Sequence, residues 1–199
     1  MRSSTSREDI LSALRAAEPP AVPLPELPEP GPLPADPVAA FELSVRAVGG
    51  EPVRVPDAAA LPGLVRALAE RLGARRVASA VDLPGVGDVD LQALPDPHAL
   101  EGIDLAILPG LFGVAENGAV WVDTRPLAHR GVFVVAQHLA LVVRASEIVS
   151  DLHAAYERID LAGPGLRLFV SGPSKTADIE QALVIGAHGA RSCTVFVVG

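Results

Sequence analysis

The chain has 199 residues, of which 49% are hydrophobic and only 4% aromatic, so its core is built mainly from Ala, Val and Leu. Its net charge of −8 and its lack of a basic stripe argue against a nucleic-acid-binding protein. The single cysteine, Cys193, excludes an internal disulfide and a cysteine cluster for zinc or iron–sulfur.

The N-terminal part of the chain predicts a short helix followed by an extended arm. Thr5 and Ser6 each precede an acidic residue by three positions, which is a capping-box pattern. Residues 19–37 hold nine of the 19 prolines and cannot be helical. We therefore expect a helix within residues 1–18, an arm or linker at 19–37 and one α/β domain at 38–199.

No apolar run reaches the length of a membrane span, and no apolar signal core follows Met1. The expected location is therefore the cytoplasm.

Beyond the arm, apolar residues at helical spacing alternate with short apolar runs, a pattern typical of α/β proteins. Helices are predicted at 41–48, 61–72, 146–159 and 177–187. Strands are predicted at 52–55, 76–80, 104–108, 119–123, 132–136, 139–143, 167–171 and 192–198. Continuous apolar strands are typical of sheets covered on both faces, and the strands between 104 and 143 have no helices between them. We expect a mixed, largely parallel sheet with helices on both faces and an antiparallel portion in the middle.

The densest group of polar residues follows the strand predicted at 167–171. The candidate ligand-binding residues in this loop are Ser171, Gly172, Ser174, Lys175, Thr176 and Asp178. Helix capping accounts for Thr176 as the N-cap and for Asp178 in the first turn, but not for the remaining hydroxyls and the ammonium group together. A loop at a helix N-terminus attracts anions, although the carboxylates here weaken a bare phosphate site.

A second motif lies at 113–118. Asn117-Gly118 between apolar residues is a strong hairpin signal. Glu116 adjoins this turn, where desolvation would raise its pKa or its nucleophilicity, and it is the candidate catalytic residue. Gly113, Asn117 and Gly118 are further candidates for ligand binding. We predict that this turn and the loop at 171–176 meet at one edge of the sheet and line one pocket.

The five histidines form none of the short pairs that metal sites use, so no metal site is predicted. His138 interrupts an apolar run and is either a cleft residue or an ordinary core or strand-edge histidine. Cys193, within a predicted strand, is expected to be a buried and inert thiol. No P-loop, dinucleotide fingerprint or GxSxG elbow is present.

Together, the two motifs resemble the lactate-utilisation protein C family, whose module is the LUD domain. The resemblance lies in SGPSKTADIEQ at 171–181, GAHG at 186–189 and GVAENG at 113–118, and it covers about residues 37–199. The family more often has Thr or Ser at the position of Asn117 and a hydroxyl residue near Ala119. Glu116-Asn117-Gly118 instead resembles the Glu-Asn-Gly of family I CoA-transferases, whose glutamate forms the acyl-CoA intermediate.

The resemblance implies the fold type of ribose-5-phosphate isomerase, glucosamine-6-phosphate deaminase and the CoA-transferases. It also implies a component of the system that oxidises L-lactate to pyruvate, with cysteine-rich and iron–sulfur proteins as partners. A chain with one cysteine would be the cluster-free subunit, with no cofactor of its own and with a small carboxylate or phosphate-bearing ligand. Two alternatives stay open. One is a stand-alone CoA-transferase- or isomerase-like enzyme that uses Glu116, with Lys175 steadying an anion; the other is a structural or regulatory subunit without chemistry.

Overall fold

The computed structural model describes residues 6–17, 19, 22–23, 25–26, 33–177 and 183–199. The chain divides into two units, Met1–Pro32 and Leu33–Gly199. The described part of the first unit holds one helix, α1 (Ser6–Ala16), with two acidic residues in its first turn. Among the described residues, no helix combines the length and the apolar character that crossing a membrane requires.

A five-stranded sheet forms the centre of the second unit, and all of its strands are parallel. Its order is β1 (Glu51–Val55), β11 (Ser192–Val198), β6 (His138–Arg144), β3 (Leu105–Pro109) and β2 (Val77–Ser79). The apolar residues of these strands are buried on both faces, which explains why the strands read as continuous apolar runs. The predicted parallel sheet is therefore confirmed.

A second sheet of four strands accounts for the predicted antiparallel portion. Its order is β7 (Ile148–Val149), β4 (Phe112–Val114), β5 (Ala119–Asp123) and β8 (Arg167–Val170). β4 and β5 form the hairpin predicted at Asn117-Gly118, and β8 pairs antiparallel with β5. The Asn117 side chain accepts a hydrogen bond from the Ala119 N–H at 3.0 Å, which fixes the turn.

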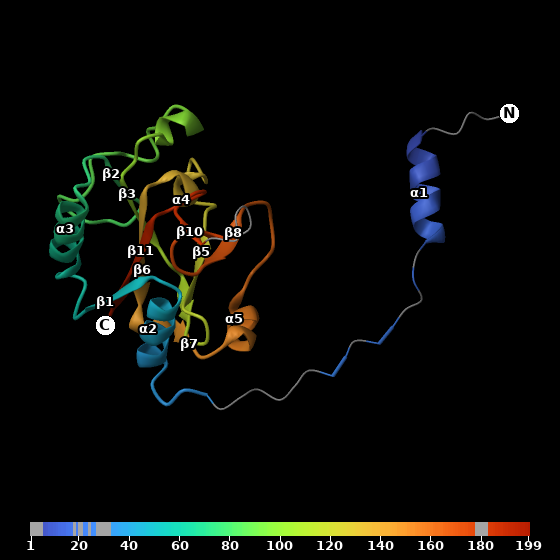
Figure 1. Cartoon of the computed structure of the whole chain (residues 1–199), viewed down its shortest axis with the longest axis horizontal. Helices are drawn as coiled ribbons and strands as arrows, with labels where there is room; N and C mark the ends of the chain where they lie inside the picture. The colour runs from blue at the N-terminus through green and yellow to red at the C-terminus, as the bar shows by residue number, and fades with distance from the viewer. Residues whose placement is uncertain (1–5, 18, 20–21, 24, 27–32, 178–182) are drawn as a thin grey trace. The chain divides into compact units, whose positions relative to one another are not determined.

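Helices cover both faces of the five-stranded sheet, as predicted (Figure 1). α3 (Leu61–Leu72) packs on one face. α2 (Pro37–Ala47), α4 (Val132–Val135) and the second sheet pack on the other. α5 (Leu152–Arg158) covers the far side of the second sheet. Two short 3-10 helices, Pro97–Leu100 and Ala145–Glu147, complete the regular structure outside the strands.

Two of the predicted elements are wrong in the middle of the chain. The strand predicted at 132–136 is the helix α4, because a short buried apolar run fits either element and here packs one face on the core. The helix predicted at 146–159 is α5 only from Leu152 onward. Asp151 caps it by accepting the Ala154 N–H at 2.9 Å, and β7 precedes it because Ile148 pairs with Gly113.

The helix predicted at 177–187 is also wrong where the chain is described. Its C-terminal part contains β10 (Val184–Ile185), which pairs antiparallel with β9 (Lys175–Thr176). Thr176 is thus a strand residue opposite Val184 and not a helix cap. β-branched side chains at these positions favour strand pairing. Asp178 and the rest of the predicted first turn, through residue 182, lie outside the described residues.

Candidate functional site

Two loops that the sequence singles out meet in the structure. We call them the hairpin loop (residues 115–118) and the β8 loop (residues 171–176). The Ser171 Oγ donates a hydrogen bond to the Asn117 carbonyl oxygen at 3.0 Å. The predicted meeting of the two loops at the edge of a sheet is therefore confirmed, although the sheet is the second one and not the parallel one.

Two glycines let both loops press against the end of α2. Gly118 has a φ of 66°, and a Cβ there would lie 2.6 Å from the Val45 nitrogen. Gly172 has a φ of 72°, and a Cβ there would lie 2.4 Å from the Val48 carbonyl oxygen. Only a residue without a side chain fits such positions without strain. These two glycines thus have a packing role at the α2 C-terminus.

Hydrogen bonds fasten the same helix end. Ser44 Oγ donates to the Ala115 carbonyl oxygen at 2.7 Å, and Lys175 Nζ donates to the Val48 carbonyl oxygen. A cation beside the last carbonyls of a helix is favoured by the helix dipole. Lys175 is nevertheless exposed, and an ammonium group has three N–H donors. It therefore keeps donors for an anion.

Lys175 is also the only lysine of the chain, which carries 16 basic residues in all. The other basic side chains are arginines. Lys175 makes no ion pair with a carboxylate in the described part of the chain. An exposed ammonium group at the end of α2, without a carboxylate partner among the described residues, is the main charged group of this region.

Ser174 lies in the second half of the β8 loop and is half-buried. Its N–H donates to the Ala190 carbonyl oxygen and its carbonyl accepts from the Gly186 N–H, each at 2.9 Å. A Cβ on Gly189 would lie 3.0 Å from the Ser174 Cβ. The backbone of Ser174 therefore ties the β8 loop to the segment that precedes β11.

Gly113, in contrast, does not belong to the surface of this region. It is buried in β4, where a Cβ would lie 2.7 Å from Ile148 Cδ1 and 2.8 Å from Phe41 Cε2. Its lack of a side chain serves packing between α2 and β7.

Glu116 is exposed, so the expected desolvation of its carboxylate is wrong. Its Oε2 accepts the Leu152 N–H at 2.8 Å, because the hairpin loop runs beside the start of α5. With Leu152, His153, Tyr156 and Glu157 it lines an open groove of about 720 Å³. Glu116 thus contacts α5, whereas its neighbour Asn117 contacts the β8 loop, and the groove that Glu116 lines contains no residue of the β8 loop, unlike the single pocket that was predicted.

His138 and Ser192 face each other across β6 and β11, with Nδ1 2.8 Å from Oγ. His138 is half-buried, and its pKa is lowered from the ordinary value, first by burial and then by the charge of Arg191. Cys193 beside it is buried, and burial raises the pKa of its thiol to about 12. The expected buried thiol is confirmed, and so high a pKa makes it a poor nucleophile.

The structure also contains a cavity that the sequence did not indicate. It has a volume of about 430 Å³ and lies at the C-terminal ends of β2, β3 and β5, at Ser79, Pro109 and Asp123. Ligands of open α/β sheets bind at this kind of edge. The signal that could have found it is the position of Asp82 and Asp90 in the loop after β2, where carboxylates follow a buried strand.

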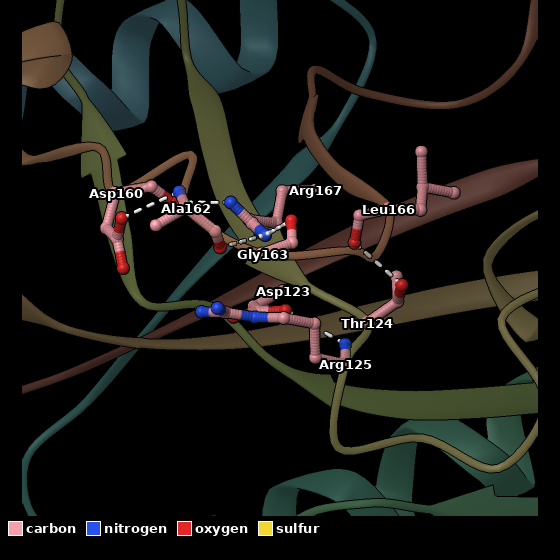
Figure 2. A network of polar contacts seen from close by, with 8 residues as sticks. All are labelled: Asp123, Thr124, Arg125, Asp160, Ala162, Gly163, Leu166 and Arg167. Atoms are coloured by element: carbon pink, nitrogen blue, oxygen red, sulfur yellow. Dashed lines mark hydrogen bonds and ion pairs between the residues drawn. The ribbon is translucent and has the colours of Figure 1, made fainter.

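Arg125 and Arg167 take part in a network of polar contacts at the end of β5, beside this cavity (Figure 2). Asp123 Oδ2 accepts a hydrogen bond from Arg125 Nε at 2.7 Å. The Arg167 guanidinium donates to the carbonyl oxygens of Ala162 and Gly163 at 2.8 and 2.9 Å. This network holds the loop before β8 in place. In the described ranges, no three His, Cys, Asp or Glu side chains converge closely enough to hold a metal ion.

Comparison with known proteins places these features in a wider group. Residues 97–198 match the family model of the LUD domain. The chain is 33% identical over 187 residues to lactate utilization protein C of Deinococcus radiodurans, which covers 88% of this chain and 86% of that protein. It is 29% identical over 172 residues to the protein of the same name from Geobacillus kaustophilus, with coverage of 82% and 69%.

A solved structure shares the fold. The crystal structure of a DUF162 family protein from Deinococcus radiodurans matches with a TM-score of 0.64 at 23% identity. The match covers 84% of this chain and all of that one.

Proposed function

Since the chain belongs to the LUD-domain family, with relatives named lactate utilization protein C, we propose that it is a component of L-lactate utilisation. In this proposal it binds a small carboxylate or phosphate-bearing ligand at the β8 loop. One observation carries the proposal: the hairpin loop and the β8 loop, which hold the family motifs, contact each other and both reach the end of α2, where Lys175 Nζ donates to the Val48 carbonyl oxygen.

The chemistry of Lys175 suits a ligand of the size and charge of lactate or pyruvate. Each of these carries one carboxylate, and a charge-assisted hydrogen bond to an ammonium group is stronger than one between neutral groups. Ser171 and Ser174 place hydroxyl groups in the same loop, which suit the hydroxyl or keto oxygen of such a ligand. In the proposal, Gly172 positions the loop, and Asn117 and Gly118 position its neighbour.

The proposal assigns the oxidation itself to partner proteins. Cys193 is buried and its thiol pKa is raised to about 12, so it suits neither cluster ligation nor thiol redox chemistry. Iron–sulfur and cysteine-rich lactate-utilisation proteins would supply the electron carriers, and this chain would be the cluster-free subunit in the cytoplasm. We propose in addition that the fold is of the ribose-5-phosphate isomerase or CoA-transferase type. The proposed division of the chain is a helix within residues 1–18, an arm or linker at 19–37 and one α/β domain at 38–199.

A second candidate function is a CoA-transferase-like activity of Glu116. Its support is the groove of about 720 Å³ that Glu116 lines. Incubation of the protein with acyl-CoA donors, followed by mass spectrometry, tests for a glutamyl adduct. Loss of the adduct in Glu116→Gln supports this function, and absence of any adduct in the native protein contradicts it. A subunit without chemistry would bind its partners but neither ligand nor acyl group.

The unique lysine allows a direct test of the carboxylate site. Reductive methylation with ¹³C-formaldehyde keeps the charge and labels only Lys175 and the α-amino group. Titration with L-lactate or pyruvate is expected to shift the Lys175 resonance to saturation, whereas neutral lactamide leaves it unchanged. A shift with inorganic phosphate alone assigns a phosphate-bearing ligand instead.

Variants provide the control for this test. Lys175→Gln is expected to abolish calorimetric binding of lactate, and Lys175→Arg to retain part of it. Arg66→Gln, an exposed position on α3, removes the same charge from a different surface. Equal weakening in Lys175→Gln and Arg66→Gln would contradict a site at the β8 loop, as would an unchanged resonance with all three anions.

A further inference from the structure

The cavity at the C-terminal ends of β2, β3 and β5 carries an inference that does not depend on the β8 loop. We call it the carboxyl-end cavity; its volume is about 430 Å³. Pockets of this size hold small organic molecules, and this one lies where parallel strands end. Lys175, Ser171 and Asn117 do not line it.

The walls of the carboxyl-end cavity are held by hydrogen bonds. After β2 the chain turns back, and the Val77 N–H donates to Asp88 Oδ1 at 2.7 Å while the Asp88 N–H donates to the Val77 carbonyl oxygen at 2.9 Å. Further along, Gln92 Nε2 donates to the Pro126 carbonyl oxygen at 2.9 Å and joins two loops. A cavity with such fixed walls is pre-formed, which lowers the entropic cost of binding.

The lining of the cavity combines buried apolar residues with exposed acidic ones. Leu83 and Leu91 are buried, at 7% and 4% exposure, and form an apolar surface. Asp82 and Asp90 are exposed and line the same cavity. Ser79 Oγ is already used, because it donates to the Val81 carbonyl oxygen at 2.7 Å and accepts from the Val81 N–H. The polar groups left for a ligand are therefore mainly acceptors.

The charges that line the cavity disfavour anions. Asp123 is paired with Arg125, and this guanidinium holds the pKa of the Asp123 carboxyl below its usual range. Figure 2 shows the Arg125 side chain lying along Asp123. Arg125 is thus neutralised by Asp123, and Asp82 and Asp90 leave two uncompensated negative charges among the lining residues. An anion entering the cavity would meet repulsion from both.

We propose that the carboxyl-end cavity binds a compact organic cation, an alkyl amine whose carbon chain covers Leu83 and Leu91 and whose ammonium groups are held by Asp82 and Asp90. A bare metal ion fits the cavity less well, because the carboxylates of the cavity do not belong to any group of three or more side chains, among the described residues, that could hold a metal ion. An alkyl diamine can contact both carboxylates through its two ammonium groups, and its carbon chain can cover the apolar surface.

A matched series of four-carbon compounds tests the charge preference. We expect 1,4-diaminobutane to bind the full-length protein in calorimetry, with 1,4-butanediol at least ten-fold weaker and succinate without detectable binding. The three compounds share a carbon chain and differ in charge. Comparable binding of succinate, or no binding of the diamine, overturns the proposal.

A pair of double variants tests the location. Asp82→Asn/Asp90→Asn keeps the side-chain shape and is expected to weaken diamine binding at least ten-fold. Glu70→Gln/Glu101→Gln makes the same change in net charge at exposed positions that do not line the cavity, and is expected to keep native affinity. Equal weakening in both double variants would show a non-specific charge effect and overturn the site. The ¹³C signal of Lys175 is expected to stay unchanged with the diamine, so failure here leaves the carboxylate site unaffected.

Discussion

The β8 loop and the carboxyl-end cavity both use polar side chains to bond backbone groups, but they leave opposite charges exposed. In the β8 loop, Ser171 and Lys175 donate to backbone carbonyls, and Gly172 serves the contact with α2. In the carboxyl-end cavity, Asp82 and Asp90 stay exposed around a hollow with an apolar surface. The density of polar residues along the sequence therefore does not by itself identify a ligand site, because backbone groups compete for these side chains in both regions.

The largest effect is expected from a substitution at Gly172, which tests the contact between the β8 loop and α2. Gly172→Ala would place a Cβ 2.4 Å from the Val48 carbonyl oxygen at a φ of 72°. We expect it to lower the free energy of unfolding by about 3 kcal/mol, from backbone strain plus the clash. Urea denaturation measures this. Gly63→Ala, in α3, where the added Cβ would meet no atom within 4 Å apart from its chain neighbours and the backbone of its own helix, is expected to stabilise by about 0.5 kcal/mol.

A loss of stability in Gly172→Ala no larger than the change in Gly63→Ala would show that the β8 loop does not depend on its contact with α2. The folded fraction of Gly172→Ala should keep native affinity for 1,4-diaminobutane, because the carboxyl-end cavity lies elsewhere.

Substitutions of Asp88 test whether the hydrogen bond from the Val77 N–H holds the wall of the carboxyl-end cavity in place. Asp88→Ala removes the acceptor of the Val77 N–H and is expected to cost about 1 kcal/mol of stability. Diamine binding should weaken several-fold, because the wall then moves. Asp88→Asn changes the charge equally but keeps an acceptor oxygen, so it should retain most of both properties. Equal losses in the two variants would assign the effect to charge and not to the hydrogen bond.

His138 provides the smallest expected effect and belongs to the end of the sheet near Ala190 and the β8 loop. Its pKa is lowered by burial and by Arg191, while Asp104 acts in the opposite direction. Because the unfolded chain binds a proton more readily, the stability that neutral His138 contributes is lost as pH falls below about 6.5 toward the native pKa. Urea denaturation between about pH 8 and pH 5 should show a steeper loss for the native protein than for His138→Gln. Parallel curves would contradict this.

The sequence predicted the bounds of those elements that a regular apolar pattern and residues close by in the chain define. The helix at 61–72 and the strands at 119–123 and 192–198 have the predicted bounds, since caps and apolar runs mark them. The strand predicted at 132–136 was wrong because distant strands decide which face of this segment is packed, and a five-residue apolar run is compatible with either helix or strand.

The candidate site was predictable only in part. The contact between Ser171 and Asn117 could be anticipated, because both lie in polar loops at the ends of predicted strands, and these loops were predicted to meet at one edge of the sheet. The exposure of Glu116 could not, because it depends on α5 beginning at Leu152 and offering an N–H to the carboxylate. The carboxyl-end cavity was missed because its lining comes from separate stretches of chain that follow β2, β3 and β5, and only their juxtaposition in the fold forms the cavity.

The hydrogen bond from Lys175 to the Val48 carbonyl oxygen has a consequence for any anion that arrives at the β8 loop. The end of α2 competes with such an anion, because the Val48 carbonyl oxygen already accepts a hydrogen bond from the ammonium group that a ligand carboxylate would bind. Binding is then an exchange in which one acceptor replaces or joins another on a single nitrogen. A carboxylate with a full negative charge binds the ammonium group more strongly than the carbonyl oxygen at the helix end does, whereas a neutral analogue of the same shape does not. The contact with α2 therefore makes binding at the β8 loop selective for charged ligands.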